Sequence, residues 1–399
     1  MGPRAVAAMS SLVLLGGCGR HGGEQPAGGV ADTFEQKLQE EVQRVVPGGV
    51  IALPPGTYTL KHTLILHASG VALRGTGTET TTLSFATAAP GTAGMVVTGN
   101  DVRIENLSIE DTPGDGLVLS GGRDVSVRGV RIAWNHPAGG ANGLRAEGVH
   151  NLLLEDVAAY SAGAAGIVVR QSRNVIVRRC HVEQNSAGLV LANVANADVS
   201  GGIATGNGVG IISGSAAGAT PPGYAQRLFG NRIYKNNLAA AGGGAVAATP
   251  NGVGIALRAV SQVEIFDNDI AYNQSANVLL GAGAAAPGFD PYPAAIYIHD
   301  NRFAGGGNAP DAEPLRSVHA ALAGGKEPLP DVVWDGRAPA TSPAGSAPQL
   351  CVRNGATRVL NTDAAHDYRQ PVMGEQALKC QLPPLPAVTL PGGGTMPGS

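Results

Sequence analysis

The feature that most constrains the fold is a repeat that recurs through the middle of the chain. Residues 165–185 read AGIVVRQSRNVIVRRCHVEQN, and residues 187–207 read AGLVLANVANADVSGGIATGN, a degenerate copy of the same pattern. A period in the twenties predicts a solenoid, in which each repeat buries its apolar side chains against the next. Asparagine or aspartate opens an alternating apolar run every 22 to 27 positions, at Asp101, Asp124, Asn151, Asn174 and Asn196.

The repeat is built from strands, because its apolar residues alternate with a period of two. Leucine-rich repeats are excluded, since neither their L-x-x-L-x-L frame nor a helical segment is present. Three short strands per repeat therefore predict an all-β chain, folded as a right-handed, single-stranded parallel β-helix of about ten rungs. Aromatic residues make up only 4% of the chain, so the core must consist of valine, isoleucine, leucine and alanine.

Equivalent positions of neighbouring rungs lie about 4.8 Å apart, so like residues are expected to form columns. The alignment predicts an inward column, an internal asparagine ladder and an outward column of alternating charge. A further row of asparagines closes successive rungs. In that order, the four sets are Val130, Val157 and Cys180; Asn231, Asn268 and Asn301; Arg232, Asp269 and Arg302; and Asn135, Asn185, Asn207 and Asn273.

The N-terminus has the pattern of a secretory signal, with Arg4 before an apolar stretch over residues 5–15. The sequence LGGC, ending at Cys18, resembles the lipobox of bacterial lipoproteins. That resemblance implies a signal peptide over residues 1–17 and lipidation of Cys18, and the glycine after it implies the outer membrane. Residues 18–31 are then expected to be a flexible tether. The protein is therefore expected to be an outer-membrane lipoprotein that faces the periplasm or the cell surface.

The first rung needs a cover, since the end of a solenoid exposes unpaired backbone. Residues 32–49 predict an amphipathic capping helix, with a capping box at Asp32 and Glu35. Its apolar stripe is Phe34, Leu38, Val42 and Val45. The capped β-helix is expected to extend over residues 32–304, where the regular pattern ends. Proline and glycine then dominate, and residues 387–399 are expected to be a disordered tail.

Two of the four cysteines are expected to pair. Cys351 and Cys380 lie in the C-terminal region of a chain predicted to be exported, which favours a disulfide between them. The chain contains no C-x-x-C and no H-E-x-x-H motif, so neither a metal nor a cofactor is predicted. The formal net charge of −3 gives no basic field, which argues against nucleic acid as a partner.

Several segments resemble a family of exported bacterial parallel β-helix repeat proteins of undefined activity. They are residues 165–189, DPYPAAIYIHDNRF (290–303), LPDVVWDG (329–336), and the CVRNG and CQLPPLP motifs around Cys351 and Cys380. The resemblance covers about residues 45 to 386, and it implies that residues 305–386 pack on the β-helix. It also implies an envelope partner, since genes of the family often accompany a di-haem c-type cytochrome. No catalytic residues are established for the family.

A patch of polar residues is the candidate site. Arg145 and Glu147 are expected to point outward, with Arg170 stacked on Glu147 one rung later and His136 in a nearby insertion. The two arginines could hold the carboxylate of a sugar acid while Glu147 or His136 moves a proton. The alternative is a surface ion pair between Glu147 and Arg170, worth under ~1 kcal/mol. Three further residues are candidates for binding: Asp111, Asp115 and Tyr160.

Four insertions interrupt the rungs, at residues 135–142, 215–226, 239–251 and 283–293. Loops inserted at corresponding turns of a solenoid gather on one face and wall a binding groove. The leading hypothesis is a lipid-anchored envelope protein that binds a polysaccharide or an envelope protein along one face. One alternative is a lyase or epimerase that acts on acidic polysaccharide. Another is a periplasmic maturation or scaffold factor associated with a c-type cytochrome.

Overall fold

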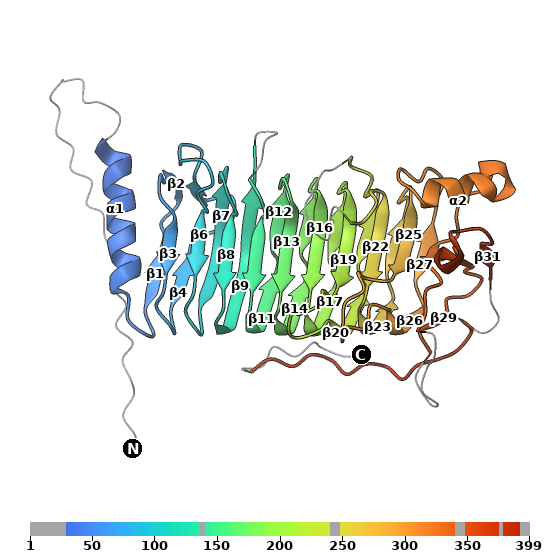
Figure 1. Ribbon diagram of the computed structural model, residues 1–399. Coiled ribbons are helices and arrows are strands. Elements are labelled where there is room, and N and C mark those ends of the chain that lie inside the picture. Colours follow the sequence, from blue (N-terminus) through green and yellow to red (C-terminus); the bar gives the residue numbers. More distant parts are fainter. Residues whose placement is uncertain (1–28, 136–139, 240–247, 340–347, 375–377, 392–399) are drawn as a thin grey trace, which may run out of the picture.

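The computed structural model describes residues 29–135, 140–239, 248–339, 348–374 and 378–391. The described chain winds into a long β-solenoid with one helix across its first end (Figure 1). Each strand pairs with the strands one turn earlier and one turn later, so the hydrogen-bonded ladders run along the axis. The prediction of an all-β, parallel β-helix is confirmed.

Two sheets form the walls of the solenoid. Among the strands of these sheets in the described residues, only β31 pairs antiparallel, with β30. The twelve-stranded sheet consists of β3 (Leu64–Leu66), β6 (Met95–Val97), β8 (Leu117–Ser120), β10 (Leu144–Glu147), β13 (Ala165–Arg170), β16 (Ala187–Ala192), β19 (Val209–Gly214), β22 (Val253–Arg258), β25 (Ala276–Gly281), β28 (Val332–Trp334), β30 (Val359–Asn361) and β31 (Val372–Met373). The nineteen-stranded sheet consists of β1 (Val50–Ala52), β2 (Gly56–Thr59), β4 (Ala72–Arg74), β5 (Thr81–Ser84), β7 (Arg103–Glu110), β9 (Arg123–Ala133), β11 (His150–Glu155), β12 (Ala158–Tyr160), β14 (Arg173–Arg178), β15 (His181–Glu183), β17 (Ala195–Ser200), β18 (Ile203–Thr205), β20 (Tyr224–Phe229), β21 (Arg232–Tyr234), β23 (Ser261–Phe266), β24 (Asp269–Ala271), β26 (Ala294–His299), β27 (Arg302–Ala304) and β29 (Leu350–Arg353).

The turn residues explain why asparagine and aspartate recur. The five residues that marked the repeat all adopt a left-handed backbone conformation, with φ between 48° and 60°. Asparagine and aspartate tolerate this conformation better than other side chains that carry a Cβ atom. The sequence period is therefore the period of the left-handed corners, at Asp101, Asp124, Asn151, Asn174 and Asn196.

The strand register confirms the predicted inward and outward columns. The inward column is Val130, Val157 and Cys180, and the outward column is Arg232, Asp269 and Arg302. Arg302 donates hydrogen bonds of 2.5 and 2.6 Å to Asp269. Burial raises the pKa of the Cys180 thiol to about 12, so this free cysteine behaves as a small apolar residue.

Buried asparagines form two ladders inside the solenoid. The predicted ladder is confirmed, with amide contacts of 3.0 Å from Asn231 to Asn268 and 2.9 Å from Asn268 to Asn301. The second ladder corrects the row of rung-closing asparagines. Asn135 does not join this ladder. It lies at the start of an insertion, where its side chain is exposed and its amide donates a hydrogen bond to Asp111. The second ladder consists of Asn185, Asn207, Asn236 and Asn273.

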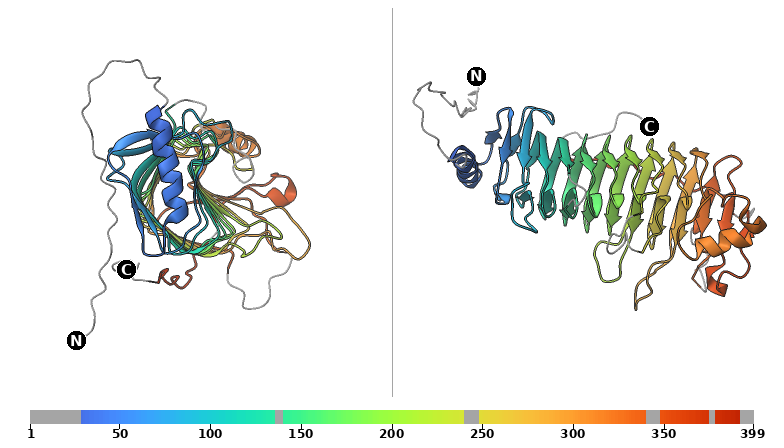
Figure 2. Two further views of the ribbon diagram at one scale, coloured as in Figure 1. Left: turned by 90° about the vertical axis from the view of Figure 1, so that its left-hand side faces the viewer. Right: turned by 90° about the horizontal axis from the view of Figure 1, so that it is seen from above.

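Helix α1 (Gly29–Arg44) caps the first rung, as predicted (Figure 2, left view). Leu38 and Val42 are buried against the solenoid, and the ring of Phe34 stacks on Tyr58 at 3.8 Å. The expected capping box was wrong. The helix begins three residues before Asp32, which places residues 29–31 in the helix instead of the tether.

Glu35 ties the helix to the first strands. Its Oε1 atom accepts hydrogen bonds from the backbone N–H groups of Lys61 and His62, at 3.1 and 2.8 Å, and the side chain is buried. Replacing Glu35 by alanine is expected to cost about 1–3 kcal/mol of local stability, because two backbone donors lose their partner. Hydrogen exchange of residues 34–44 should accelerate in this variant. The matched control, exposed Gln36→Ala, should leave the exchange unchanged, and equal rates in both variants would contradict the role of Glu35.

The solenoid continues beyond residue 304. Strands β28 and β30 extend the twelve-stranded sheet, and β29 extends the other. The segments on either side of these strands hide the period in the sequence. Helix α2 (Leu315–Ala321) and the short 3-10 helix Ala323–Gly325 precede β28, and the 3-10 helix Ala364–His366 follows β30. The region expected to pack on the β-helix therefore contributes further rungs to it.

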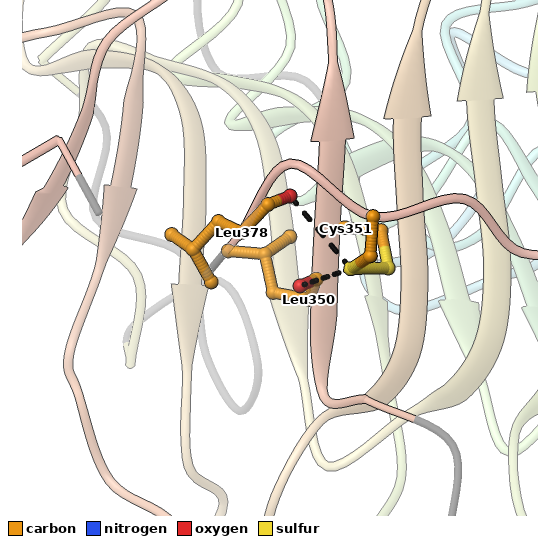
Figure 3. Close-up of a disulfide and its surroundings, with 4 residues drawn as sticks. Leu350, Cys351 and Leu378 are labelled. Carbon is orange, nitrogen blue, oxygen red and sulfur yellow. Dashed lines mark hydrogen bonds between the residues drawn. A yellow bond between two sulfur atoms is a disulfide. The ribbon is translucent and has the colours of Figure 1, made fainter. Parts of the chain in front are cut away.

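The disulfide between Cys351 and Cys380 is confirmed, with a Cα–Cα distance of 4.9 Å. Figure 3 shows it beside Leu350 and Leu378, and the carbonyl oxygen of Leu350 lies 3.6 Å from the Cys380 sulfur. The bond fixes the start of the C-terminal segment on β29.

The expected disordered tail was wrong for residues 387–391. This segment runs back along the outside of the nineteen-stranded sheet (Figure 1), and Val388 and Leu390 are buried against Leu153 and Ile176. Proline and glycine suggested disorder, but the two apolar side chains have apolar partners on the outer surface. The rest of the expected tail, residues 392–399, lies outside the described residues.

The expected signal peptide and Cys18 also lie outside the described residues, so the lipoprotein hypothesis stays a prediction. Within the described ranges, no helix is long and apolar enough to cross a membrane.

Candidate functional site

Two columns of outward-facing side chains run along the twelve-stranded sheet. The first, called the arginine column, contains small residues between charged ones. By strand register it consists of Glu147, Arg170, Ala192, Gly214, Arg258, Gly281 and Asp335. The second column is apolar beyond its first residue and consists of Arg145, Val168, Val190, Ile212, Ala256, Leu279 and Val333. Arg170 and Arg258 are thus three rungs apart, with no large side chain of their column between them.

The structure brings three of the candidate residues together at Arg145. The Arg145 guanidinium donates to Asp115 at 2.6 Å through Nε and to Glu147 at 3.0 Å through Nη1. Although burial acts to lower it, the pKa of Arg145 is raised by the hydrogen bonds and charges of these two carboxylates. Asp115 also accepts two hydrogen bonds from Asn142, at 2.9 and 2.8 Å. Arg145 already has two anionic partners, so it is poorly placed to hold a substrate carboxylate.

Glu147 and Arg170 lie in register on neighbouring strands, as expected. The ion pair of Glu147 is nevertheless formed with Arg145, on the same strand. Among the described residues Arg170 has no ion-pair partner, and its side chain is exposed. Arg170 is therefore a free cation on this face.

The remaining candidates lie elsewhere or serve the turns. Asp111 has a left-handed φ of 54° and accepts the N–H of Asn135 at 2.8 Å, which is a turn role. Tyr160 is on β12, in the other sheet, with its hydroxyl 3.3 Å from Nδ1 of His181. Burial raises the pKa of Tyr160. His136 lies outside the described residues. The structure thus separates Tyr160 from the Arg145 group.

The insertions border the twelve-stranded sheet from both edges. Residues 135–142 and 239–251 come just before strands β10 and β22 of this sheet, whereas residues 215–226 and 283–293 come just after β19 and β25. Loops project from one side of the solenoid in the right-hand view of Figure 2. The insertions therefore mark the face that carries the arginine column.

A cavity of about 570 Å³ lies on this face near the C-terminal end of the sheet. It is lined by Arg258 and Asp335 of the arginine column, and also by Pro250 of an insertion, Pro314 before α2, and Tyr368. Both Asp335 oxygens are held in place, since Oδ2 accepts the N–H of Ala282 at 2.7 Å and Oδ1 that of Arg337 at 3.0 Å.

Burial governs the charges in this cavity. It lowers the pKa of Arg258, against the stabilising charges of Asp335 and Tyr368. It raises the pKa of Asp335, against the hydrogen bonds from Ala282 and Arg337. Among the described residues Arg258 has no ion-pair partner. A cation and an acid of raised pKa therefore share one partly enclosed space, which is the arrangement of a binding or proton-transfer site.

Arg258 and Asp335 were missed in the sequence. The signal was present for Arg258, because it ends the run VGIALR just as Arg170 ends AGIVVR. Asp335 carried no such signal, because its strand lies beyond the point where the regular period is visible. Within the described ranges, no group of three or more histidine, cysteine, aspartate or glutamate side chains could hold a metal ion.

Residues 69–221 match the family model described as the right-handed beta helix region. No curated protein sequence matches the chain. One similar solved structure is the A-module of the mannuronan C-5 epimerase AlgE4 of Azotobacter vinelandii, at 16% identity and a TM-score of 0.52, over 81% of this chain and 90% of that chain. Another is the DFA-IIIase of Arthrobacter chlorophenolicus A6 in complex with GF2, at 11% identity and a TM-score of 0.56, over 84% of this chain and 91% of that chain.

At these identities the likenesses show a shared fold and leave the activity open. Together with the two sheets, they identify the fold of this chain as a right-handed parallel β-helix.

Proposed function

We propose that the protein binds an acidic polysaccharide along the outward face of the twelve-stranded sheet. The observation that carries the proposal is the pair of arginines without ion-pair partners among the described residues, Arg170 and Arg258, in one column with only Ala192 and Gly214 between them. Three rungs separate the two guanidinium groups, or roughly 14 Å along the axis. A linear sugar chain laid along the axis would pass over both.

The chemistry of the column suits a sugar acid. A guanidinium presents paired N–H donors that match the two oxygens of a carboxylate. Val190 and Ile212 of the neighbouring apolar column are buried, so a sugar chain on this face would contact the arginine column. Neutral sugars would leave the arginines without anionic partners, so acidic polymers should bind best.

The similar solved structures support a carbohydrate as the ligand class. One is described as an epimerase of mannuronan and the other as a DFA-IIIase in complex with GF2. The positions of the insertions, next to β10, β19, β22 and β25, add support, because loops inserted beside the strands of one sheet commonly wall a binding groove.

A lyase or epimerase is the second candidate, favoured by the cavity at Arg258. Asp335, with its pKa raised by burial, could exchange a proton with a sugar while Arg258 stabilises the charge that develops on the sugar carboxylate. Elimination would leave an unsaturated uronate, which absorbs in the ultraviolet. Incubating the protein with alginate and polygalacturonate while following this absorbance therefore tests the lyase, and proton exchange with solvent tests the epimerase.

Replacing Arg258 by glutamine is expected to weaken binding of a uronate polymer by about tenfold to a hundredfold, because one charge-assisted contact is lost. Isothermal titration with size-fractionated alginate and polygalacturonate measures the change, with neutral dextran as the reference ligand. The control is Arg302→Gln, which removes an exposed arginine that is paired with Asp269 in the other sheet.

The binding proposal fails if Arg258→Gln and Arg302→Gln weaken binding equally, or if dextran binds as well as the acidic polymers.

A further proposal concerns the location of the protein. The LGGC sequence at Cys18 supports a lipid anchor that would present the arginine column from the cell envelope. Incorporation of a labelled fatty acid that is lost in Cys18→Ser tests it.

A further inference from the structure

The C-terminal segment lies along a second outward column, on the nineteen-stranded sheet. This column, called the track, has one residue per rung. Residues 382–391, called the strap, lie along it. By register the track consists of Leu153, Ile176, Asp198, Arg227, Glu264, Tyr297 and Cys351. The strap begins next to the Cys351–Cys380 disulfide and runs toward the N-terminal rungs (Figure 1).

Two backbone donors of the strap bind carboxylates of the track. The N–H of Leu385 donates to Oε2 of Glu264 at 3.0 Å, and the N–H of Val388 donates to Oδ2 of Asp198 at 3.1 Å. From Leu385 to Val388 the strap advances by three residues, and the two carboxylates that it contacts lie two rungs apart. Two rungs span about 9.6 Å, close to the rise of about 9.3 Å for one turn of a polyproline II helix.

Burial follows the same period over residues 382–388, and the period ends there because Leu390, two residues after Val388, is buried as well. Leu382 and Leu385 are half-buried and Val388 is buried, whereas the residues between them, 383–384 and 386–387, are exposed. A period of three is that of the polyproline II helix, whereas a β-strand would bury every second residue. The composition LPPLP, at residues 382–386, fits this conformation because proline fixes φ near −65°.

The track has the features of a built binding site. Asp198 is fully buried, although it belongs to an outward column, and its two oxygens accept 2.7 and 2.6 Å hydrogen bonds from Arg227. Glu264 is 4% exposed, and its other oxygen lies 3.1 Å from Nε2 of His299. Charged groups are rarely buried unless each is paired and oriented. Arg227 and His299 orient these carboxylates, and the remaining acceptor capacity faces the strap.

We propose that the track is a binding site for polyproline II segments and that residues 382–391 are its built-in ligand. The site selects a segment that carries a free N–H at every third residue and an apolar side chain on the same face. The Cys351–Cys380 bond keeps the built-in ligand at high effective concentration, so a segment supplied separately binds only when the strap is removed. This proposal is independent of the polysaccharide site, which lies on the other sheet.

The test uses a chain that ends at Gln381, which retains the disulfide but lacks the strap, and a labelled peptide of residues 382–391. Fluorescence anisotropy should show saturable binding of the peptide to the shortened chain and almost none to the full chain. A peptide with Leu385→Pro and Val388→Pro lacks both donors and should bind at least about tenfold more weakly. The Ala387→Pro peptide is the matched control, because position 387 is exposed and proline favours the same helix.

The proposal is overturned if the peptide does not bind a shortened chain that keeps its β-sheet circular dichroism. It is also overturned if the donor-deficient peptide binds as well as the control. Should the shortened chain not fold, limited proteolysis of two full-length variants decides. Val388→Pro is expected to speed cleavage within the strap several-fold over Ala387→Pro, and equal rates would exclude recognition through the N–H groups.

Discussion

Asp198→Ala is expected to lower the free energy of unfolding by about 3–5 kcal/mol, the range for a buried ion pair that loses one partner. Arg227 is 8% exposed, and its guanidinium would be left without the two hydrogen bonds that it donates to Asp198. The N–H of Val388 would lose its acceptor as well. Urea denaturation followed by circular dichroism measures the loss.

Asp269→Ala is the matched control, because Asp269 also accepts two hydrogen bonds from an arginine of the next rung, Arg302. The Arg302 side chain is 82% exposed, so water replaces the lost contacts and stability should hardly change. The double variant Asp198→Leu, Arg227→Met removes both charges and should recover most of the loss, as expected when apolar residues replace a buried pair. An equally mild effect of Asp198→Ala and Asp269→Ala would contradict this account.

The fold could be predicted because each corner of the solenoid leaves a mark in the sequence. Left-handed residues such as Asn174 and Asn196 recur with the period of the rungs, and the strands between them alternate. Once the rungs are aligned, columns such as Arg232, Asp269 and Arg302 follow from the register alone. Where an insertion changes the spacing between rungs, as at Asn135, the alignment of rungs fails. A residue at the edge of a loop no longer contacts the equivalent residue of the next rung.

The candidate site could be predicted only in part, since it depends on contacts between distant rungs. Register placed Glu147 next to Arg170, but the choice of Arg145 as the partner of Glu147 depends on side-chain reach within one strand. Asp335 and the strap lie where proline and glycine hide the period. The position of Asp335 follows from contacts between distant residues, such as the hydrogen bond to Ala282 across 53 residues. The strap depends on still longer separations, such as the 121 residues between Leu385 and Glu264.

Asn207→Ala is expected to cost about 3–5 kcal/mol, because the side chain makes four buried hydrogen bonds. Its Oδ1 atom accepts the N–H and the amide of Asn185, at 3.0 and 2.9 Å. Its Nδ2 atom donates to the carbonyl of Val182 at 3.0 Å and to the amide oxygen of Asn236 at 2.9 Å. The residue is fully buried, so no water replaces these partners, and each unsatisfied group costs about 1–3 kcal/mol.

An outer ladder, formed by the corner residues Asn151, Asn174 and Asn196, supplies the control. Asn174 donates to Asn151 at 2.9 Å and accepts from Asn196 at 2.8 Å, but it is only half-buried. Asn174→Gly removes these bonds while keeping the left-handed φ of 54°, and it is expected to cost about 1 kcal/mol because water can bind the freed groups. If Asn174→Gly were as costly as Asn207→Ala, stacking of asparagines in itself would stabilise the solenoid. A large difference between them would instead show that the inner ladder stabilises the solenoid because it satisfies backbone groups that the closed core hides from water.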